Sequence, residues 1–234
     1  RQILSSGLIK KKIDNNGINQ MIQYQSTKAP CTIIRNIKIL NPGSFGQFHK
    51  ETFNLEIKSY YKPRINIDNY NDDYNNIIQK VKNEVIESIE KRMIADVDVA
   101  AFLSGGIDSS IIVSMMSKIS DKKINTFSLV HEQSNYDESY YSDLISDQYK
   151  TNHYKVRISK EELISNVSEA LDSFDSPSAD GLNSYMVSKK IKEHGIKVAI
   201  SGLGGDELFS GYPQFKYWYI FNKLNFLIPK KLLS

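Results

Sequence analysis

The sequence predicts an α/β protein built on a parallel, doubly wound, Rossmann-like sheet that a partial β-rich segment precedes. From residue 74 onward, segments with helical periodicity alternate with short apolar runs, as in strands that helices connect. Two glycine-rich loops directly follow two of these runs. With 40% hydrophobic and 24% charged residues, the composition is that of a folded globular chain. These observations imply a mostly parallel sheet with helices on both faces.

Residues 1–60 differ from the rest of the chain. Short apolar pieces alternate there with turn signals such as Asn15-Asn16-Gly17, and isoleucines at positions 33, 34, 37 and 39 suggest short β elements. Residues 61–73 are polar and have the composition of a linker. We therefore expect a partial β-rich domain over 1–60, a linker over 61–73 and a second domain over 74–234.

The second domain is expected to begin with a helix over 74–93, where apolar residues recur every three or four positions. Asp72 and Asp73 precede this helix and suit its N-terminus. Apolar runs predict strands over 97–103, 124–130, 153–158 and 197–200. Helical patterns predict helices over 109–119, 140–149, 160–174 and 182–194, with an aromatic helix after the second glycine-rich loop.

Charge, cysteine usage and hydropathy exclude several classes. The net charge is only +3 and the lysines are scattered, so nucleic acid is not indicated as a partner. Cys31 alone allows no intrachain disulfide, and the four histidines lack the spacing of a metal site. No run approaches the ~20 apolar residues of a membrane span, and the N-terminus has no signal-peptide pattern. We expect a cytoplasmic protein without membrane contact, and the start at Arg1 indicates a fragment.

The segment SGGIDSS, residues 104–110, joins the strand ending at Leu103 to the next helix. In parallel sheets the ligand crevice lies beyond the carboxyl ends of the strands. Gly105 and Gly106 let several amide N–H groups converge with the helix N-terminus into an anion cradle, and the serines add hydroxyls. Asp108 would repel a phosphate unless a divalent cation lay between them, which makes it a candidate magnesium ligand. A strand-to-helix turn with Asp108 as a simple cap explains the same residues.

A second loop, SGLGGDELFSGY at residues 201–212, repeats this arrangement. It follows the apolar run 198–200, and its glycines precede Asp206 and Glu207. Two such loops at the ends of two strands could hold one metal ion on a polyphosphate. Neither the Gly-Lys-Ser/Thr ending of a P-loop nor the Gly-x-Gly-x-x-Gly of a dinucleotide site occurs in the first loop, so those two classes are disfavoured.

SGGIDSS resembles the pyrophosphate loop of the N-type ATP pyrophosphatases, whose fold is adenine nucleotide alpha hydrolase-like. SGLGGDELFSGYPQF resembles the glutamine-hydrolysing asparagine synthetases within that group. NYDESYYSDLISDQYKTNHYKV and DSPSADGLNSYMVSKKIKEHGIKVAI resemble the same family in the same order. IRNIKILNPGSF resembles the end of its glutaminase domain. The chain is therefore similar to the first part of the synthetase domain, over 74–234, preceded by the tail of the glutaminase domain, over 1–60.

The resemblance implies a carbon–nitrogen ligase with glutamine as amide donor. ATP activates a carboxylate, normally the side chain of aspartate, as an acyl-adenylate, and pyrophosphate leaves. Ammonia released from glutamine then attacks the adenylate, which gives asparagine and AMP. ATP and Mg²⁺ are the implied cofactors, and a homodimer is the implied assembly of the full-length protein. Backbone amides and Mg²⁺ would meet the charge that develops on pyrophosphate.

The family's roles are carried over only to the positions that match. Asp108 and Asp206 are the implied catalytic pair and the implied magnesium ligands. The motif residues Asp137-Glu138 and Asp175-Ser176-Pro177 also match, although a helix cap and a turn explain them equally well. The implied nucleotide-binding positions are Leu103, Ser104, Gly105, Gly106, Asp108, Ser109, Ser110, Leu129, Ser201 and Gly202.

Three departures from the family pattern keep alternatives open. Leu203 stands where many relatives carry an acidic residue thought to act in the second step, so the acceptor carboxylate is open. The family's glutaminase uses an N-terminal cysteine, whereas this chain begins with Arg1. The family's synthetase domain also continues past residue 234. The alternatives to an asparagine synthetase are a pyrophosphatase that amidates another carboxylate and a truncated remnant that binds nucleotide or a partner subunit.

Overall fold

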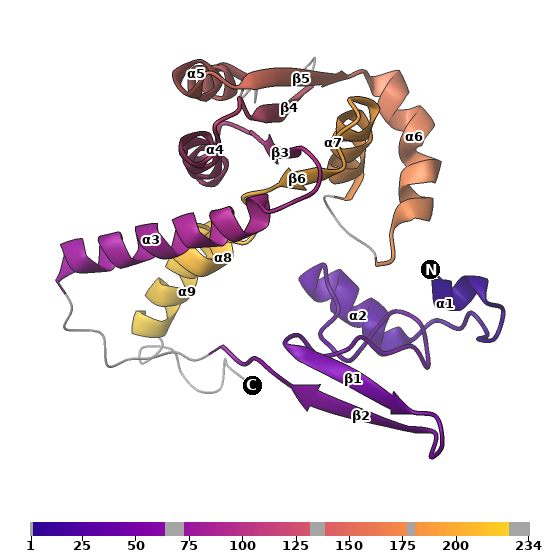
Figure 1. Cartoon of the computed structure of the whole chain (residues 1–234). Coiled ribbons are helices and arrows are strands. Elements are labelled where there is room, and N and C mark those ends of the chain that lie inside the picture. The colour runs from indigo at the N-terminus through magenta and orange to yellow at the C-terminus, as the bar shows by residue number, and fades with distance from the viewer. Residues whose placement is uncertain (1, 64–72, 132–138, 177–180, 225–234) are drawn as a thin grey trace. The chain divides into compact units, whose positions relative to one another are not determined.

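The computed structural model describes residues 2–63, 73–131, 139–176 and 181–224. Its contacts divide the chain into two compact units. One comprises Arg1–Ile78 and Glu161–Met186, and the other comprises Gln79–Lys160 and Val187–Ser234. Figure 1 shows the elements in chain order. Each unit is described by itself below.

The second unit is built on a four-stranded parallel sheet with the order β5-β4-β3-β6. The chain enters at β3, in the interior of the sheet, and continues outward to β4 and β5. It then returns to place β6 on the opposite side of β3. From β3 the chain thus proceeds toward one edge of the sheet, and the connection from β5 to β6 crosses back to the other edge. Because the direction of the strand order reverses at β3, its carboxyl end is a topological switch point. The strands are β3 Val99–Phe102, β4 Asn125–His131, β5 Asn152–Ile158 and β6 Val198–Ile200.

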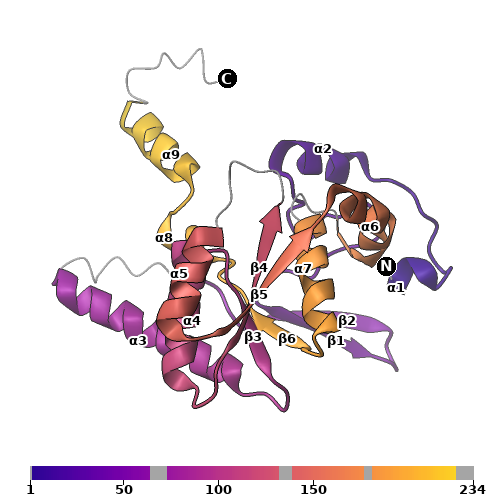
Figure 2. The same cartoon turned by 90° about the horizontal axis from the view of Figure 1, so that it is seen from above.

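One face of this sheet packs on a core shared by α3 (Tyr74–Met93) and α4 (Ile107–Ile119). The periodic apolar side chains of α3 meet it through Ile89, which is buried. Removing this apolar surface from water is the main force that fixes the helices on the strands. Figure 2 shows α4 and α5 (Ser139–Tyr149) on one side of the sheet. The part of α7 (Gly181–Glu193) that belongs to the same unit, from Val187 onward, lies on the other side. The buried members of the core cluster are Ile89, Ala101, Leu103, Val113, Met116, Ile124 and Ile200.

The opposite face carries an aromatic contact with the end of α7. The ring of His194 lies 5.3 Å from the ring of Phe127 and 4.7 Å from that of Tyr154, centroid to centroid. Phe127 and Tyr154, on neighbouring strands, are themselves stacked at 4.9 Å. Offset and edge-on ring contacts of this kind add to the burial of apolar area. Both faces of the parallel sheet are therefore covered, as the sequence predicts.

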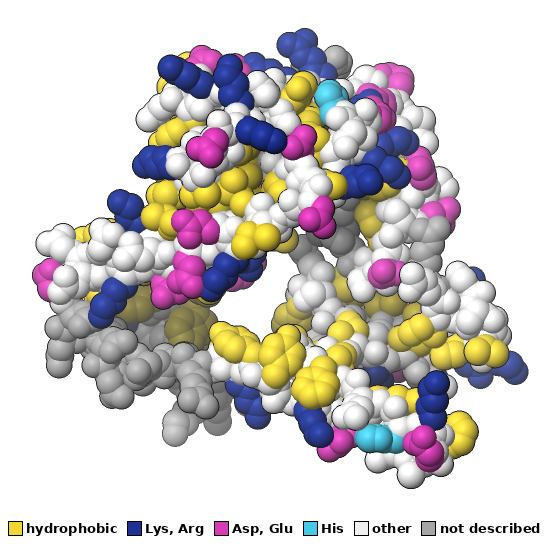
Figure 3. All heavy atoms as spheres, in the orientation of Figure 1, with side chains coloured by type: hydrophobic (Ala, Val, Ile, Leu, Met, Phe, Trp, Pro, Cys, Tyr) yellow, Lys and Arg dark blue, Asp and Glu magenta, His cyan; other side chains and the backbone are white. Residues whose placement is uncertain are grey.

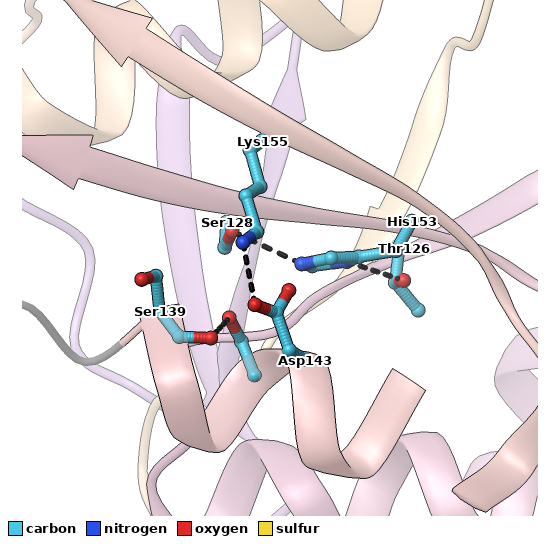
Figure 4. A network of polar contacts seen from close by, with 7 residues as sticks. Thr126, Ser128, Ser139, Asp143, His153 and Lys155 are labelled. Atoms are coloured by element: carbon cyan, nitrogen blue, oxygen red, sulfur yellow. Dashed lines mark hydrogen bonds and ion pairs between the residues drawn. The ribbon is translucent and has the colours of Figure 1, made fainter. Parts of the chain in front are cut away.

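A polar cluster links the sheet to α5 (Figure 4). The imidazole of His153 on β5 lies 2.9 Å from Thr126 Oγ1 through Nδ1 and 3.2 Å from Ser128 Oγ through Nε2. Beside it, Lys155 Nζ donates to Asp143 Oδ2 at 2.5 Å. Burial of the ring lowers the pKa of His153 below its ordinary value of 6.5, although the charge of Asp143 works in the other direction. The neutral imidazole is therefore the form that this packing favours.

The N-terminal unit contains α1 (Gln2–Ser5), α2 (Asn15–Tyr24), α6 (Lys160–Ser173) and an antiparallel hairpin of β1 (Ser44–His49) and β2 (Asn54–Ser59). The hairpin confirms β structure in this segment, but the turn predicted at Asn15-Asn16-Gly17 is wrong, because these residues begin α2. Asp14 caps that helix by accepting hydrogen bonds from two of its first amides.

The sequence predicts short β elements at Ile33, Ile34, Ile37 and Ile39. Among the described residues of this region, the structure forms only an isolated antiparallel bridge between Ile13 and Ile34. A buried glycine inside α2 explains why a turn signal became a helix. A Cβ on Gly17 would lie 2.9 Å from the Cα of Ile33, so a larger residue could not pack here. Glycine therefore serves close packing at this position rather than a turn.

The other predicted elements are confirmed to within two residues. The helix predicted over 74–93 is α3 with the same bounds. Each remaining strand and helix of the second domain occurs in the predicted order, and the aromatic helix is α9 (Pro213–Leu224). The second glycine-rich loop differs from its prediction, because Gly205–Phe209 within it form the short helix α8. Most of the predicted linker and all of Asp137-Glu138 lie outside the described residues. Over the described ranges, we find no helix with both the length and the apolar character to cross a membrane.

Candidate functional site

The first glycine-rich loop, residues 104–110, leaves the carboxyl end of β3 and opens α4. Gly105 has a φ of +87°, in the left-handed region that favours glycine, which allows the chain to turn sharply into the helix. Gly106 is the N-cap residue, and no side chain of the described structure caps the helix there. The first-turn amides of α4 therefore point outward as donors, which is the arrangement that binds anions.

The serine hydroxyls of this loop hold its shape. Ser104 Oγ accepts a hydrogen bond from the Gly106 amide at 3.2 Å and lies 3.1 Å from Ser109 Oγ. Ser109 and Ser110 donate to the Gly106 carbonyl at 3.1 and 2.7 Å. Ser109 is buried, so its two contacts are partly shielded from solvent, whereas the bonds from the Gly106 amide and from Ser110 are exposed. The cradle is thus organised before any ligand arrives.

The second loop lies directly against the first. A Cβ on Gly202 would be 3.0 Å from Asp108 Cβ and 3.1 Å from the Ser109 amide nitrogen. A Cβ on Gly205 would collide with the carboxylate of Asp108. The two glycines are therefore required for close approach and not for a special φ. Only glycines here allow the Asp108 carboxylate to rest on the start of α8.

The hydroxyl of Tyr212, at the end of the second loop, is bonded to one carboxylate and feels the charge of two more. The hydroxyl donates to Glu207 Oε1 at 3.0 Å. That hydrogen bond is the main cause of a raised pKa of Tyr212, and the negative charges of Glu207, Asp206 and Asp108 add to the effect. Asp108 and Asp206, far apart in the sequence, therefore act on the same phenol. The side chain of Asp206 also contacts Gly211, whose amide donates to the Asp206 carbonyl at 3.0 Å.

The remaining predicted positions divide into buried and accessible ones. Leu103 is fully buried in the core cluster, so a ligand could reach only its main chain. Leu129, near the end of β4, is half-buried. Ser201 is exposed and its hydroxyl accepts a hydrogen bond from the Leu203 amide at 3.2 Å. The side chain of Leu203 is 89% exposed at the tip of the loop.

Sequence reasoning missed the pairing of Tyr212 with Glu207. The two are five residues apart, on either side of the end of α8, and their hydrogen bond spans the Ser210–Gly211 turn. An acidic residue followed at this distance by Gly-Tyr is the only signal the sequence offers, and spacing alone does not distinguish it from an ordinary surface pair. The left-handed φ of Ser210, +57°, is what folds the chain back.

The described residues include no group of three or more His, Cys, Asp or Glu side chains placed to hold a metal ion. Asp108 and Asp206 are two carboxylates, both half-buried. Mg²⁺ is commonly held by one or two carboxylates together with substrate phosphates and water. A pair of carboxylates beside an anion cradle therefore fits magnesium bound with a polyphosphate, and does not fit a metal held by protein ligands alone.

Fold and loops together define an α/β protein whose candidate ligand site lies at the switch point of a parallel sheet. A family model described as asparagine synthase matches residues 80–233. The chain belongs to the asparagine synthase family.

Two curated relatives and one solved structure show how far this similarity extends. The chain is 32% identical over 206 residues to the glutamine-hydrolysing asparagine synthetase 1 of Bacillus subtilis strain 168, covering 86% of this chain and 31% of the relative. It is 25% identical over 232 residues to asparagine synthetase 3 of that strain, covering 92% of this chain and 37% of the relative. The solved structure of the NH3-dependent NAD synthetase from Campylobacter jejuni aligns with this chain at a TM-score of 0.39 and 16% sequence identity. The alignment covers 57% of this chain and 60% of that chain, and this similarity carries no argument about function.

The chain thus spans about a third of the length of these curated relatives. Residues 80–234 make up less than 86% of the 234-residue chain. The match to asparagine synthetase 1 therefore also includes part of the N-terminal segment.

Proposed function

We propose that this chain forms the nucleotide-binding part of an asparagine synthetase-like amidotransferase, which adenylates a carboxylate with ATP. The observation that carries the proposal is the contact of two glycine-rich loops at the switch point, where Asp108 rests against Gly202 and Gly205. The anion cradle made of helix amides carries Asp108 in its first turn, and the charges of Asp108 and Asp206 both act on the Tyr212 hydroxyl. The membership of the asparagine synthase family supports the same function.

In this proposal the pyrophosphate part of ATP lies on the first-turn amides of α4. Ser104, Ser109 and Ser110 keep those amides in place through their bonds to Gly106. Asp108 and Asp206 would hold Mg²⁺ on the phosphates, and the ion would supply charge neutralisation for the departing pyrophosphate. The main chain of Leu103, together with Leu129, Ser201 and Gly202, would border the nucleoside.

The proposed chemistry needs little proton transfer in its first step. A carboxylate oxygen of the acceptor attacks the α-phosphorus, and the bond from that phosphorus to the bridging oxygen breaks, so that pyrophosphate leaves. The preorganised amides stabilise the charge that develops on the leaving group. Ammonia then attacks the acyl carbon, AMP leaves with the electron pair of the former acyl–oxygen bond, and the nitrogen loses one proton to water to give the neutral amide. Ammonia would derive from glutamine in a glutaminase domain, of which residues 1–60 would be the tail.

The acceptor is proposed to be aspartate, with a second candidate class. Leu203, at the tip of the second loop, projects into solvent and presents an apolar surface where many relatives carry an acidic residue. An apolar tip favours an acceptor whose group next to the carboxylate is less polar than that of aspartate. A cytoplasmic location and a homodimer are expected of the full-length protein, and the domain bounds 1–60, 61–73 and 74–234 stay predictions.

A double-mutant cycle on the two aspartates tests the shared magnesium site. Asp108→Asn and Asp206→Asn should each weaken MgATP binding by about tenfold or more, the loss typical of disturbing a metal site. Because both act through one ion, the double variant should lose less than the product of the single losses. MgATP affinity is measured by calorimetry, and thermal unfolding shows that each variant is folded. Asp121→Asn, an exposed residue beyond the other end of α4, is the charge-matched control.

The alternative, two separate helix caps, makes the opposite prediction. Each substitution would then cost up to about 1 kcal/mol of stability, the two costs would add, and nucleotide affinity would not change. Unchanged MgATP affinity in both single variants would reject the proposed site.

A further inference from the structure

The N-terminal unit contains a cavity that the proposed adenylation chemistry does not use. Its volume is about 320 Å³. Three cationic side chains, one amide and two aliphatic residues line it, and none of the lining residues is acidic. These residues are Leu8, Ile9, Lys10, Lys12, Arg35 and Asn36.

Backbone pairing brings two of the cations together. Ile13 and Ile34 form an antiparallel bridge, and the Arg35 amide donates to the Lys12 carbonyl at 2.8 Å. Lys12 and Arg35 are therefore opposite each other in this pairing, one position beyond the bridge. Successive side chains of an extended segment point to opposite sides, so the pair faces away from the two isoleucines.

The same alternation of side chains divides the basic triplet Lys10-Lys11-Lys12. Lys10 and Lys12 share one side of the extended segment and both line the cavity, whereas Lys11 does not. The triplet therefore divides into two cavity residues and one matched residue outside it. That division supplies an internal control of the same type, in the same run.

Lys10, Lys12 and Arg35 are exposed, so solvent and salt weaken the repulsion between them while the cavity is empty. Like charges directly opposite each other in a β pairing destabilise it. Among the described residues none of the three cations forms an ion pair. Lysine and arginine offer only donors, so water or an anion must satisfy them. An anion in the cavity would be attracted by all three cations.

The lining residues indicate the class of anion. The planar guanidinium of Arg35 matches the paired oxygens of phosphate or carboxylate, and two ammonium groups favour more than one negative charge. The volume is that of a small-molecule site. Leu8, 88% exposed, and the half-buried Ile9 add an apolar wall. We propose that this cavity binds a small metabolite that carries a multiply charged phosphate group, independently of the nucleotide site.

Hydrogen–deuterium exchange on the full chain with inorganic pyrophosphate locates the site. Slower exchange is expected over residues 8–14 and 33–36. Protection confined to 104–110 would overturn this proposal while leaving the proposed function intact, and protection at 8–36 alone would support it. Vesicles of phosphatidylcholine and phosphatidylserine in equal parts provide the lipid comparison. Protection of 8–36 by vesicles but not by pyrophosphate would overturn the assignment to a small molecule.

Calorimetry with pyrophosphate then compares two single substitutions in the triplet. Lys12→Gln should weaken the binding at this site by about tenfold, the equivalent of one charge-assisted hydrogen bond, and Arg35→Gln by at least as much. Lys11→Gln should leave it unchanged. Without ligand, Lys12→Gln should not lower the unfolding temperature, because it relieves repulsion from Arg35. Equal losses for Lys11→Gln and Lys12→Gln would show a diffuse surface charge effect and overturn the proposal.

Discussion

The two glycine-rich loops end neighbouring parallel strands and have similar sequences, but the structure holds them in different ways. The loop after β3 is closed by its own serines, and Ser109 is buried within it. The loop after β6 is held by backbone turns and by the Tyr212–Glu207 bond, while its apolar side chains point outward. Leu203, Leu208 and Phe209 in the second loop are all at least 60% exposed.

This difference separates a fixed part of the site from a variable part. The first loop has its donors positioned and its hydroxyls occupied, so its geometry does not depend on a ligand. The second loop places side chains around the same point with few packing constraints on them. Substitutions of the first loop's serines should therefore damage fold and binding together, whereas substitutions of the second loop's exposed apolar side chains should change recognition alone. The contact between Gly202 and Asp108 is where the two parts meet.

Among the glycine substitutions, the largest effect is expected at Gly202, where the second loop touches the first. Gly202→Ala should lower the free energy of unfolding by about 1–3 kcal/mol, the usual cost of overpacking. Its Cβ would press on main-chain atoms of Asp108 and Ser109 at 3.1–3.2 Å, which cannot yield as a side chain would. Nucleotide binding should be lost in parallel. Chemical denaturation and nucleotide titration measure the two effects.

Gly106→Ala is the matched control for this steric effect. Its Cβ would meet only the Ser104 hydroxyl, at 3.3 Å, and a side chain can rotate away. A smaller loss of stability is therefore expected at Gly106. Equal stability of the two variants would mean that the loops separate easily and that the contact does not organise the site.

The contact also shows what sequence can and cannot predict here. Glycines after two apolar runs predicted two loops at one edge of a parallel sheet, and the structure brings those loops together. The contacts of Gly202 and Gly205 with Asp108 depend on the strand order, because β6 lies beside β3. Packing between residues far apart in the sequence sets that order. The Tyr212–Glu207 pair depends similarly on a left-handed Ser210. Periodicity carries no information on either feature.

The N-terminal segment shows the opposite failure, where a local signal was present and misinterpreted. Asn15-Asn16-Gly17 has turn composition, but Asp14 before it supplies a helix cap, and α2 results. Whether this segment forms a turn or a helix depends on the tertiary contact of Gly17, which packs against Thr32 and Ile33. Tertiary packing thus overrides a local propensity worth about 1 kcal/mol. In α3, where periodicity extends over five turns, the prediction needed no such contact and matched the structure.

An intermediate effect is expected from acid, and it acts on the sheet that supports both loops. The folded state lowers the pKa of His153, so the unfolded chain binds the proton more tightly. Stability should be constant above about pH 6.5, the ordinary pKa, and should fall as the pH drops through 6.5 toward the lower folded-state value. Thermal unfolding at several pH values measures this decrease.

His153→Gln keeps polar atoms beside Thr126 and Ser128 but cannot titrate in this range. The variant should therefore be less sensitive to acid than the wild type, whatever its stability at neutral pH. An identical pH dependence in the two proteins would assign the acid sensitivity to other groups. Nucleotide affinity in the folded variant should be unaffected, since neither glycine-rich loop contains His153.

The smallest effect on stability is expected at the tip of the second loop, where two leucines a hundred positions apart allow a matched comparison. Leu203→Ala should change the free energy of unfolding by no more than about 0.5 kcal/mol, because the side chain is 89% exposed. Leu103→Ala, at a fully buried position beside the first loop, should cost about 2–5 kcal/mol. If Leu203 contacts the acceptor, its loss should weaken acceptor binding while MgATP affinity stays constant, as equilibrium titrations with each ligand would show. A stability loss at Leu203 close to that at Leu103 would mean that the loop tip is packed in solution, and the division into a fixed and a variable part would then be wrong.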